Sequence, residues 1–472
     1  MNYKNFNENL KSFAIKNKNY IFITALLLTI ITTFLFSYYS ARGFNIGPVI
    51  IIPVFLTLIY FNIVNSPKNY KRAILYLFLI STLFQVYLGA AFYGFSFDIN
   101  AMLNIAKIYD AGLDPFNYVE GSLDLNYWPA QHFMPPNLPF GALSYYAILK
   151  LSQITSIPYS TLLHFPSIIA TLIIGILLMN FMRYKGRKDN EIFKILAFYF
   201  YNPIVLMVSG YHGTWENVAI LFLVAYFIYM ERSKLIKPLS HLLYGISLLI
   251  KHIGIFQFPY FLNKQKSFFG KIVFIFLALS PFLLLTFSFM KFSLVGVAND
   301  LIMQSGENPI AYTGVKYVWS YSRIEGHLTT SVFNLPQIHD FFAKVYPIIT
   351  ILMFLIMFVY FYKNKNINYL DGIILSFLFY YVLNPGFGLH YLIWILPFAA
   401  LRLNIFYYLY TALASVMLLL AYYGDANRYW FVRDALGISI FGEILWVVII
   451  IWLIWYLKEI KKSRLDQSSQ PE

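Results

Sequence analysis

One aspartate stands where an apolar run gives way to a polar segment. Asp98 belongs to FSFDINAMLNIAKIYDAGLDPF and follows the end of that run by a few residues. A carboxylate at the edge of a hydrophobic region can accept the proton of a bound hydroxyl group, as a general base does. An aspartate that caps the N-terminus of a helix would occupy the same position. Both interpretations place Asp98 at the start of an amphipathic helix lying on the membrane interface, because the apolar residues that follow recur at helical spacing.

A lysine and three further side chains stand at the edges of other apolar runs. Lys251 and His252 lie in GISLLIKHIGIF. An ammonium group there is unfavourable unless it is paired or reaches the headgroups, so the phosphate of a membrane-bound ligand would supply a partner. His390 and Tyr391, in NPGFGLHYLIWILPF, open another apolar run and are candidates of the same kind.

Two loops add hydrogen-bonding groups. The short turn SGYHGTWENVAI holds His212, Glu216 and Asn217, which either line a sugar-sized cavity or belong to a solvated turn. Arg323, in YSRIEGHLTT, suits a phosphate or an acceptor group because a guanidinium binds phosphate through two parallel hydrogen bonds. An exposed ion pair with a neighbouring acid is the alternative for Arg323.

The composition requires a lipid environment for the elements that position these residues. Hydrophobic residues make up 59% of the 472 positions and charged residues 12%, with a mean hydropathy of +0.63. The net charge of +14 is spread in short clusters between apolar runs, which excludes a nucleic-acid surface built as one basic stripe. The chain has no cysteine, which excludes disulfides and thiolate chemistry.

The apolar runs predict an all-α membrane protein with about 14 membrane helices, some of them short or re-entrant. Segments 239–251 and 253–263 are too short to span straight, and we interpret them as a hairpin broken near Lys251 and His252 or as one kinked span. The predicted helices lie at residues 20–40, 45–64, 73–94, 159–182, 192–209, 216–230, 239–251, 253–263, 271–291, 342–362, 369–384, 389–401, 404–423 and 437–457.

The distribution of lysine and arginine sets the orientation. Basic clusters such as RYKGRK at 183–188 and KEIKKSR at 458–464 fall in one set of loops, and the positive-inside rule makes those loops cytoplasmic. Both termini are then cytoplasmic, and two long loops, 95–158 and 292–341, are extracytoplasmic. We expect one membrane domain over residues 1–472, with its polar chemistry in the outer loops and with the run 140–154 at the interface.

The order of these motifs resembles that of the GT-C superfamily of integral membrane glycosyltransferases, and within it the mannosyl- and glucosyltransferases. The matching pieces are FDINAM, GLDPF, YWPAQHFMPPNLPF, YHGTWENVAILFLVAYF, GISLLIKHIGIFQFPYFL and NPGFGLHYLIWILPF, in the family's order. The resemblance implies an inverting transfer of one hexose, mannose before glucose, from a polyprenyl- or dolichyl-phosphate donor. The acceptor is a hydroxyl of a glycan, glycolipid or protein on the extracytoplasmic or lumenal side of the plasma membrane or endoplasmic reticulum.

The same resemblance assigns roles to the candidate residues. Asp98 is the general base, and Lys251, with His252 or His390, holds the donor phosphate. Sugar or acceptor contacts fall to His212, Glu216, Asn217, Tyr391 and Arg323. Asn100, two positions after Asp98, replaces the second acid of the metal-binding members, so a metal-independent reaction is expected, although Asp110, Asp114 and Asp124 leave this open.

Two other function classes remain open at this stage. A transporter or flippase of a lipid-linked anionic glycan would also need many helices and a basic site, but its path requires polar groups along the helix interiors. A polysaccharide polymerase or ligase would also keep its chemistry in large outer loops. Neither a Walker loop, a dinucleotide glycine motif nor HExxH is present, so nucleotide-driven and zinc-protease chemistry lack support.

Overall fold

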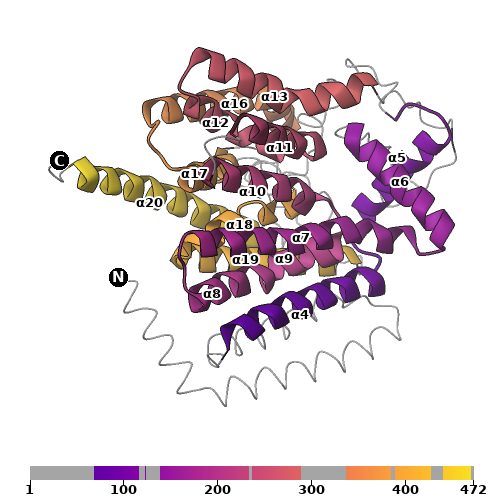
Figure 1. The fold of residues 1–472 in the computed structure, drawn as a ribbon. Helices are drawn as coiled ribbons and strands as arrows, with labels where there is room; N and C mark the ends of the chain where they lie inside the picture. Colours follow the sequence, from indigo (N-terminus) through magenta and orange to yellow (C-terminus); the bar gives the residue numbers. More distant parts are fainter. Residues whose placement is uncertain are drawn as a thin grey trace.

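The computed structural model describes residues 69–115, 123, 139–232, 237–288, 336–383, 388–426 and 440–468. All regular secondary structure in these ranges is helical, which confirms the all-α class. Most helices run side by side, and α5 (Ser96–Asp110) and α6 (Pro139–Thr155) cross at one end of the bundle (Figure 1). The amphipathic helix predicted after residue 98 is therefore present as α5, and the run 140–154 forms α6.

A proline breaks the predicted helix 192–209. In its place α8 (Asp189–Phe200) is followed by α9 (Pro203–Val205) and the π-helix η2 (Leu206–His212), at an angle of 46°. Pro203 has no backbone N–H to continue the helix, and the Asn202 side chain accepts the Ile204 N–H at 3.0 Å to begin the next one. Helix η2 follows this bend, and His212 is its last residue.

The segment 239–263 is a hairpin, as one of the two interpretations of the sequence predicted. Helix α11 (Lys237–Ile250) ends before Lys251, and η3 (His252–Gln257) and α12 (Phe258–Lys264) return along it. The Tyr244 hydroxyl donates to the Gly254 carbonyl at 2.6 Å, and the Tyr244 and Phe261 rings lie 5.2 Å apart. Lys251 is therefore at the turn of the hairpin.

The remaining helices complete the bundle. The predicted helix 389–401 is instead three short pieces, η5, α18 and η6, with Pro397 near the start of the middle piece. The bounds of the helices not yet given are α4 (Tyr70–Ala91), α7 (Tyr159–Tyr184), α10 (Glu216–Arg232), α13 (Phe268–Ser288), α16 (Pro336–Lys363), α17 (Tyr369–Leu383), η5 (Leu389–Ile393), α18 (Leu396–Ala399), η6 (Ala400–Arg402), α19 (Ile405–Ala426) and α20 (Gly442–Ser468).

Within the described ranges, four helices are long and apolar enough to cross a membrane: α4, α7, α13 and α19. The bent pair of α8 with α9 and η2 makes a fifth if it counts as one span. The number of about 14 is not confirmed, because several predicted spans are shorter helices, such as Tyr369–Leu383. The predicted helices 20–40 and 45–64 lie outside the described residues.

Large apolar side chains cover the outside of the bundle as well as its core. Leu83 on α4, Phe276 on α13 and Ile351 on α16 are each about two-thirds exposed, at 66%, 67% and 66%. Exposed large apolar side chains on several helices are unfavourable in water and suit contact with lipid chains. The surface is therefore compatible with a membrane protein.

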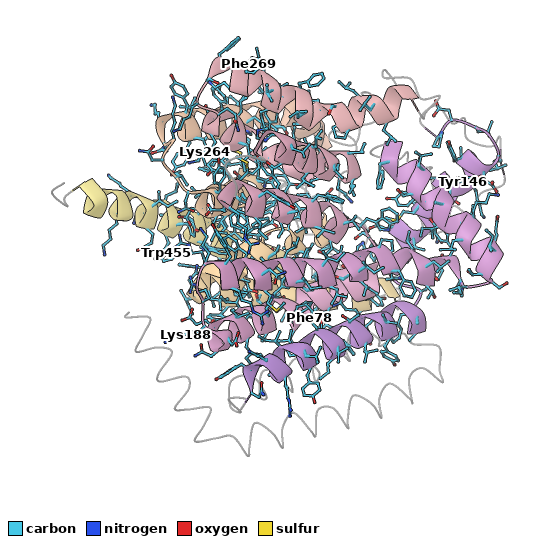
Figure 2. All side chains as sticks on the ribbon, in the orientation of Figure 1. Phe78, Tyr146, Lys188, Lys264, Phe269 and Trp455 are labelled. Atoms are coloured by element: carbon cyan, nitrogen blue, oxygen red, sulfur yellow. The ribbon has the colours of Figure 1, made fainter. Side chains whose placement is uncertain are left out.

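The two ends of the bundle differ in charge. Figure 2 shows Lys188 and Lys264 at the end opposite Tyr146 of α6. Other basic residues lie at the same end. The Lys264 ammonium donates to the Lys365 carbonyl at 2.8 Å, and the Lys185 ammonium donates to the Glu231 carboxylate at 2.8 Å. We call this the basic end and the end that carries α5 and α6 the site end.

Candidate functional site

Two carboxylates stand at the starts of helices at the site end. Asp98 is in the first turn of α5, and Glu216 is the first residue of α10. The partial positive charge of a helix N-terminus favours an ionised carboxylate at this position. The cap of α5 is Phe95 rather than Asp98, so capping does not account for the aspartate.

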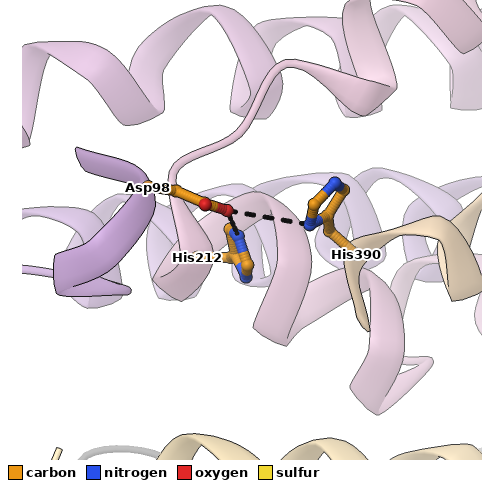
Figure 3. A group of neighbouring side chains, drawn as sticks. All are labelled: Asp98, His212 and His390. Carbon is orange, nitrogen blue, oxygen red and sulfur yellow. Dashed lines mark hydrogen bonds and ion pairs between the residues drawn. The ribbon is translucent and has the colours of Figure 1, made fainter. Parts of the chain in front are cut away.

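Asp98 is paired with His212, 114 positions later in the chain. The Nε2 atom of His212 lies 2.6 Å from the Asp98 Oδ2 atom (Figure 3). Because an ionised carboxylate only accepts hydrogen bonds, the Nε2 atom donates. The other ring nitrogen, Nδ1, lies 2.6 Å from the Tyr422 hydroxyl, and this contact fixes the orientation of the imidazole.

His390 lies between the two carboxylates. Its Nδ1 atom is 3.7 Å from the Asp98 Oδ2 atom, and its Nε2 atom is 3.2 Å from the Glu216 Oε1 atom. The same Oε1 atom is 2.5 Å from the Lys251 ammonium. Lys251 therefore has a protein partner, Glu216, which the sequence did not indicate.

These five side chains form two layers. The Asp98 side chain is 21% exposed, and those of Lys251 and His390 are each 15% exposed. The His212 and Glu216 side chains are 1% and 0% exposed and lie behind them. The first three groups are therefore partly open to solvent, and the inner two contact them from the buried side.

The backbone brings Asp98 and His212 together through two glycines. Gly94 and Gly213 have φ angles of 93° and 87°, which side-chain-bearing residues rarely adopt. At Gly94 a Cβ atom would lie 2.6 Å from the Tyr211 carbonyl oxygen, so only glycine permits this approach. The Phe95 N–H then donates to the His212 carbonyl at 3.4 Å, and the Phe95 ring stacks on the imidazole at 4.8 Å.

The electrostatic surroundings keep Asp98 ionised. Burial raises the pKa of Asp98, but the hydrogen bond from His212 and the positive potential of His212, His390 and Lys251 oppose this and leave the pKa below its ordinary value. Burial raises the pKa of the neighbouring Tyr145 phenol to about 12, so that group stays protonated. The site therefore offers a carboxylate base beside a neutral hydroxyl.

The other predicted residues are placed differently. Asn217 points into the bundle, where its amide contacts the Thr171 and Ser209 hydroxyls at 2.5 and 2.6 Å. The Tyr391 ring stacks on Trp394 at 4.0 Å, with the Lys251 ammonium 5.8 Å from the centre of the Tyr391 ring. Arg323 and the His252 side chain lie outside the described residues.

Sequence patterns did not indicate the aromatic residues of the site. Tyr422 contacts His212, Tyr145 contributes a neighbouring phenol, and Phe95 packs on the imidazole. Among 40 tyrosines and 47 phenylalanines, no local spacing singles these three out. Their proximity to Asp98 comes only from the tertiary fold.

A separate cavity of about 570 Å³ lies at the basic end. Arg187, Lys194 and Arg402 line it together with acidic groups, and Arg402 pairs with Asp371 at 3.2 Å. None of the Asp98, His212, Glu216, Lys251 and His390 side chains lines this cavity. We take the side-chain cluster rather than this cavity as the candidate site, because the cluster holds the partly exposed base and the matched charges.

The Glu216–Lys251 pair predicts a large asymmetry in stability. Lys251→Met leaves the fully buried Glu216 without its principal counter-charge and should lower the free energy of unfolding by about 3–5 kcal/mol. The double variant Glu216→Leu with Lys251→Met should lose less than the sum of the two single variants. Thermal unfolding in detergent measures both.

The matched control is Lys150→Met at the exposed pair with Asp110, whose ammonium–carboxylate distance is 2.6 Å. That change should have a much smaller effect on the free energy of unfolding, because solvent screens the pair. An equal, small loss for Lys251→Met and Lys150→Met would contradict the buried pair.

Comparison with protein-family models, with curated proteins and with solved structures gives no match to this chain. Its function is therefore inferred from the residues of the site and their geometry.

Proposed function

We propose that this protein is a GT-C-like inverting glycosyltransferase that moves one hexose from a polyprenyl- or dolichyl-phosphate donor to an acceptor hydroxyl. Mannose is the sugar that the motif order favours. The observation that carries the proposal is the partly exposed, ionised Asp98, held by His212 and placed beside Lys251 and His390.

In this reaction Asp98 acts as the general base. Its carboxylate takes the proton of the acceptor hydroxyl while the hydroxyl oxygen forms a bond to the anomeric carbon. The bond from that carbon to the phosphate oxygen breaks, and the lipid phosphate leaves with the electron pair. Attack opposite the leaving group inverts the anomeric configuration. His212 donates its hydrogen bond to the Asp98 Oδ2 atom and so orients the carboxylate. The Oδ1 atom takes no part in that hydrogen bond.

Lys251 and His390 are the groups suited to the donor phosphate. The Lys251 ammonium has three N–H donors and uses one toward Glu216, so the others can bind phosphate oxygens. Positive charge at this position stabilises the charge that develops on the leaving group. Glu216 holds the ammonium at the site when no phosphate is bound.

Burial favours positioning roles for three residues that the sequence assigned to sugar or acceptor contacts. His212, Glu216 and Asn217 are each 1% exposed or less, so a sugar does not reach them without rearrangement. His212 orients Asp98, and Glu216 orients Lys251 and His390. Tyr391 remains a candidate for sugar contact, together with Arg323 in the second long loop.

The topology that this reaction needs follows from the charge difference between the ends. If the basic end is cytoplasmic, the positive-inside rule makes the site end extracytoplasmic and both termini cytoplasmic. A sugar nucleotide made in the cytoplasm would not reach such a site, whereas a lipid-linked sugar moved across the membrane would. About 14 membrane segments remain part of this proposal.

A transporter or flippase is the second candidate, favoured by one observation. The bent pair of α8 with α9 and η2 is a discontinuous helix, and such helices form the substrate sites of many transporters. Ser209 of η2 accepts hydrogen bonds from Thr171 of α7 and Asn217 of α10 inside the bundle. A polymerase or ligase would share the outer site and differ in its acceptor.

The proposed orientation predicts which end reacts with an impermeant reagent. The chain has no cysteine, so a single introduced cysteine is the only thiol that the reagent can label. Gln153→Cys on α6 and Lys188→Cys before α8 are matched, since both positions are exposed. In sealed right-side-out vesicles, a charged maleimide should label Cys at 153 directly and Cys at 188 only after permeabilisation. The reverse pattern would place the site in the cytoplasm.

The proposed base predicts the effect of Asp98→Asn. Asparagine keeps the size of the side chain but does not accept the proton, so the transfer rate should fall by about 10²-fold or more. Radiolabelled polyprenyl-phosphate hexoses and native membrane extract measure transfer by purified wild type and variant. Asp110→Asn on the same helix is the control and should retain activity. Full activity of a folded Asp98→Asn protein would remove Asp98 as base.

A further inference from the structure

Three potential metal ligands converge at the site. The Asp98 carboxylate, His212 Nε2 and a ring nitrogen of His390 each offer one ligand atom, and these atoms all lie within 4.8 Å of one another. Figure 3 shows the two imidazoles approaching the same carboxylate from different helical segments. The His390 Nδ1 atom is 3.7 Å from the Asp98 Oδ2 atom, which is too long for a hydrogen bond but suits two ligands of one cation.

The second ring nitrogen of each histidine faces a polar partner. His212 Nδ1 meets the Tyr422 hydroxyl at 2.6 Å, and His390 Nε2 lies 3.2 Å from the Glu216 Oε1 atom. Histidines that bind metals commonly have such a partner on the other nitrogen, because it fixes the tautomer and the ring orientation. Both imidazoles are thus oriented toward the Asp98 carboxylate.

The charge balance also favours a cation. Imidazoles must be neutral to bind a metal ion, and in that state Asp98 and Glu216 contribute two negative charges against one positive charge from Lys251, so the cluster is negative. The Lys251 ammonium is paired with Glu216, which reduces its repulsion of a second cation. Adding a divalent ion would make the cluster positive, a sign that suits an anionic ligand.

We propose that Asp98, His212 and His390 form a binding site for a divalent transition-metal ion of the Zn²⁺ type. Two imidazoles and one carboxylate match the ligand preferences of zinc and its neighbours, whereas Mg²⁺ and Ca²⁺ prefer oxygen ligands alone. Three protein ligands leave a coordination position open, as in catalytic rather than structural zinc sites.

The proposed site differs from the expectation of a metal-independent reaction, which depended on Asn100. That side chain accepts a hydrogen bond from the Tyr93 hydroxyl at 2.6 Å, and the structure brings two histidines from distant segments to Asp98 instead. At the metal–ligand bond lengths of about 2.0–2.1 Å, the 2.6 Å contact between Asp98 and His212 would open by several tenths of an ångström. The ion would bind the Oδ2 atom of Asp98, and the Oδ1 atom would still be able to accept a proton.

Metal binding is measured without any transfer assay, so its outcome is separate from that of the proposed glycosyltransferase. Purified full-length protein, with any affinity tag removed, is stripped with EDTA, dialysed and titrated with CoCl₂ and with ZnCl₂. Cobalt absorption in the visible range reports coordination, and elemental analysis gives the stoichiometry. We expect one equivalent per chain, displacement of cobalt by zinc, and a rise in the melting temperature on metal addition.

Substitutions at the site test which side chains bind the metal ion. His390→Gln and Asp98→Asn should each weaken metal binding at least 10-fold, and Glu216→Gln, which touches His390 but not the ion, should weaken it 10- to 100-fold. Asp110→Asn, a carboxylate elsewhere on α5, is the matched control and should bind as wild type does. Melting curves without metal confirm that each variant is folded. Absence of binding by wild type, or binding that both His390→Gln and Asp98→Asn leave unchanged, would overturn the site.

Discussion

Glu216 has no contact with solvent, and a carboxylate in that position must be neutralised by its neighbours. Its Oε1 atom contacts Lys251 at 2.5 Å and His390 at 3.2 Å, and these come from two other segments of the chain. Burying a lone charge is far more costly than burying a paired one, so the start of α10, the turn of the α11–η3 hairpin and the start of η5 must meet at one place. The rest of the site depends on this contact.

Asp98 is the outer counterpart of Glu216. The hydrogen bond from His212, which ends η2, holds its carboxylate, and Tyr422 of α19 holds the other side of the imidazole. The left-handed backbone at Gly94 and Gly213 lets α5 approach η2 this closely. Four segments that are distant in sequence, α5, η2, the α11–η3 turn and η5, thereby present one base, two imidazoles and one ammonium at a single end of the bundle, away from most of the basic residues.

Much of the fold could be predicted from the sequence because it depends on local properties of the chain. Apolar periodicity located most of the described helices and indicated the amphipathic α5, and the two short segments around Lys251 left a hairpin as one of two interpretations. Proline explains where the prediction was wrong: at Pro203 and Pro397 the chain divides into short pieces. The number of spans could not be fixed in this way, since helices such as α17 are shorter than a bilayer requires.

Only part of the candidate site could be predicted from the sequence. Asp98, Lys251 and His390 were selected from their positions at the ends of apolar runs, and His212 and Glu216 from a short polar turn. The structure brings all five together. Their pairings depend on tertiary contacts that local patterns do not contain. Sequence reasoning therefore did not identify Glu216 as the partner of Lys251 or Tyr422 as the partner of His212, and it did not group Asp98 with the two histidines.

The central claim is that Asp98 removes a proton from an acceptor as the acceptor attacks the sugar opposite the lipid phosphate. The most direct test is the anomeric configuration of the product formed by wild-type protein in proteoliposomes from a polyprenyl-phosphate hexose of known configuration, determined by NMR. The account predicts complete inversion at the anomeric carbon. Retention of configuration would require a covalent or two-step route and would contradict a single general base, and absence of transfer from every donor would favour the transporter instead.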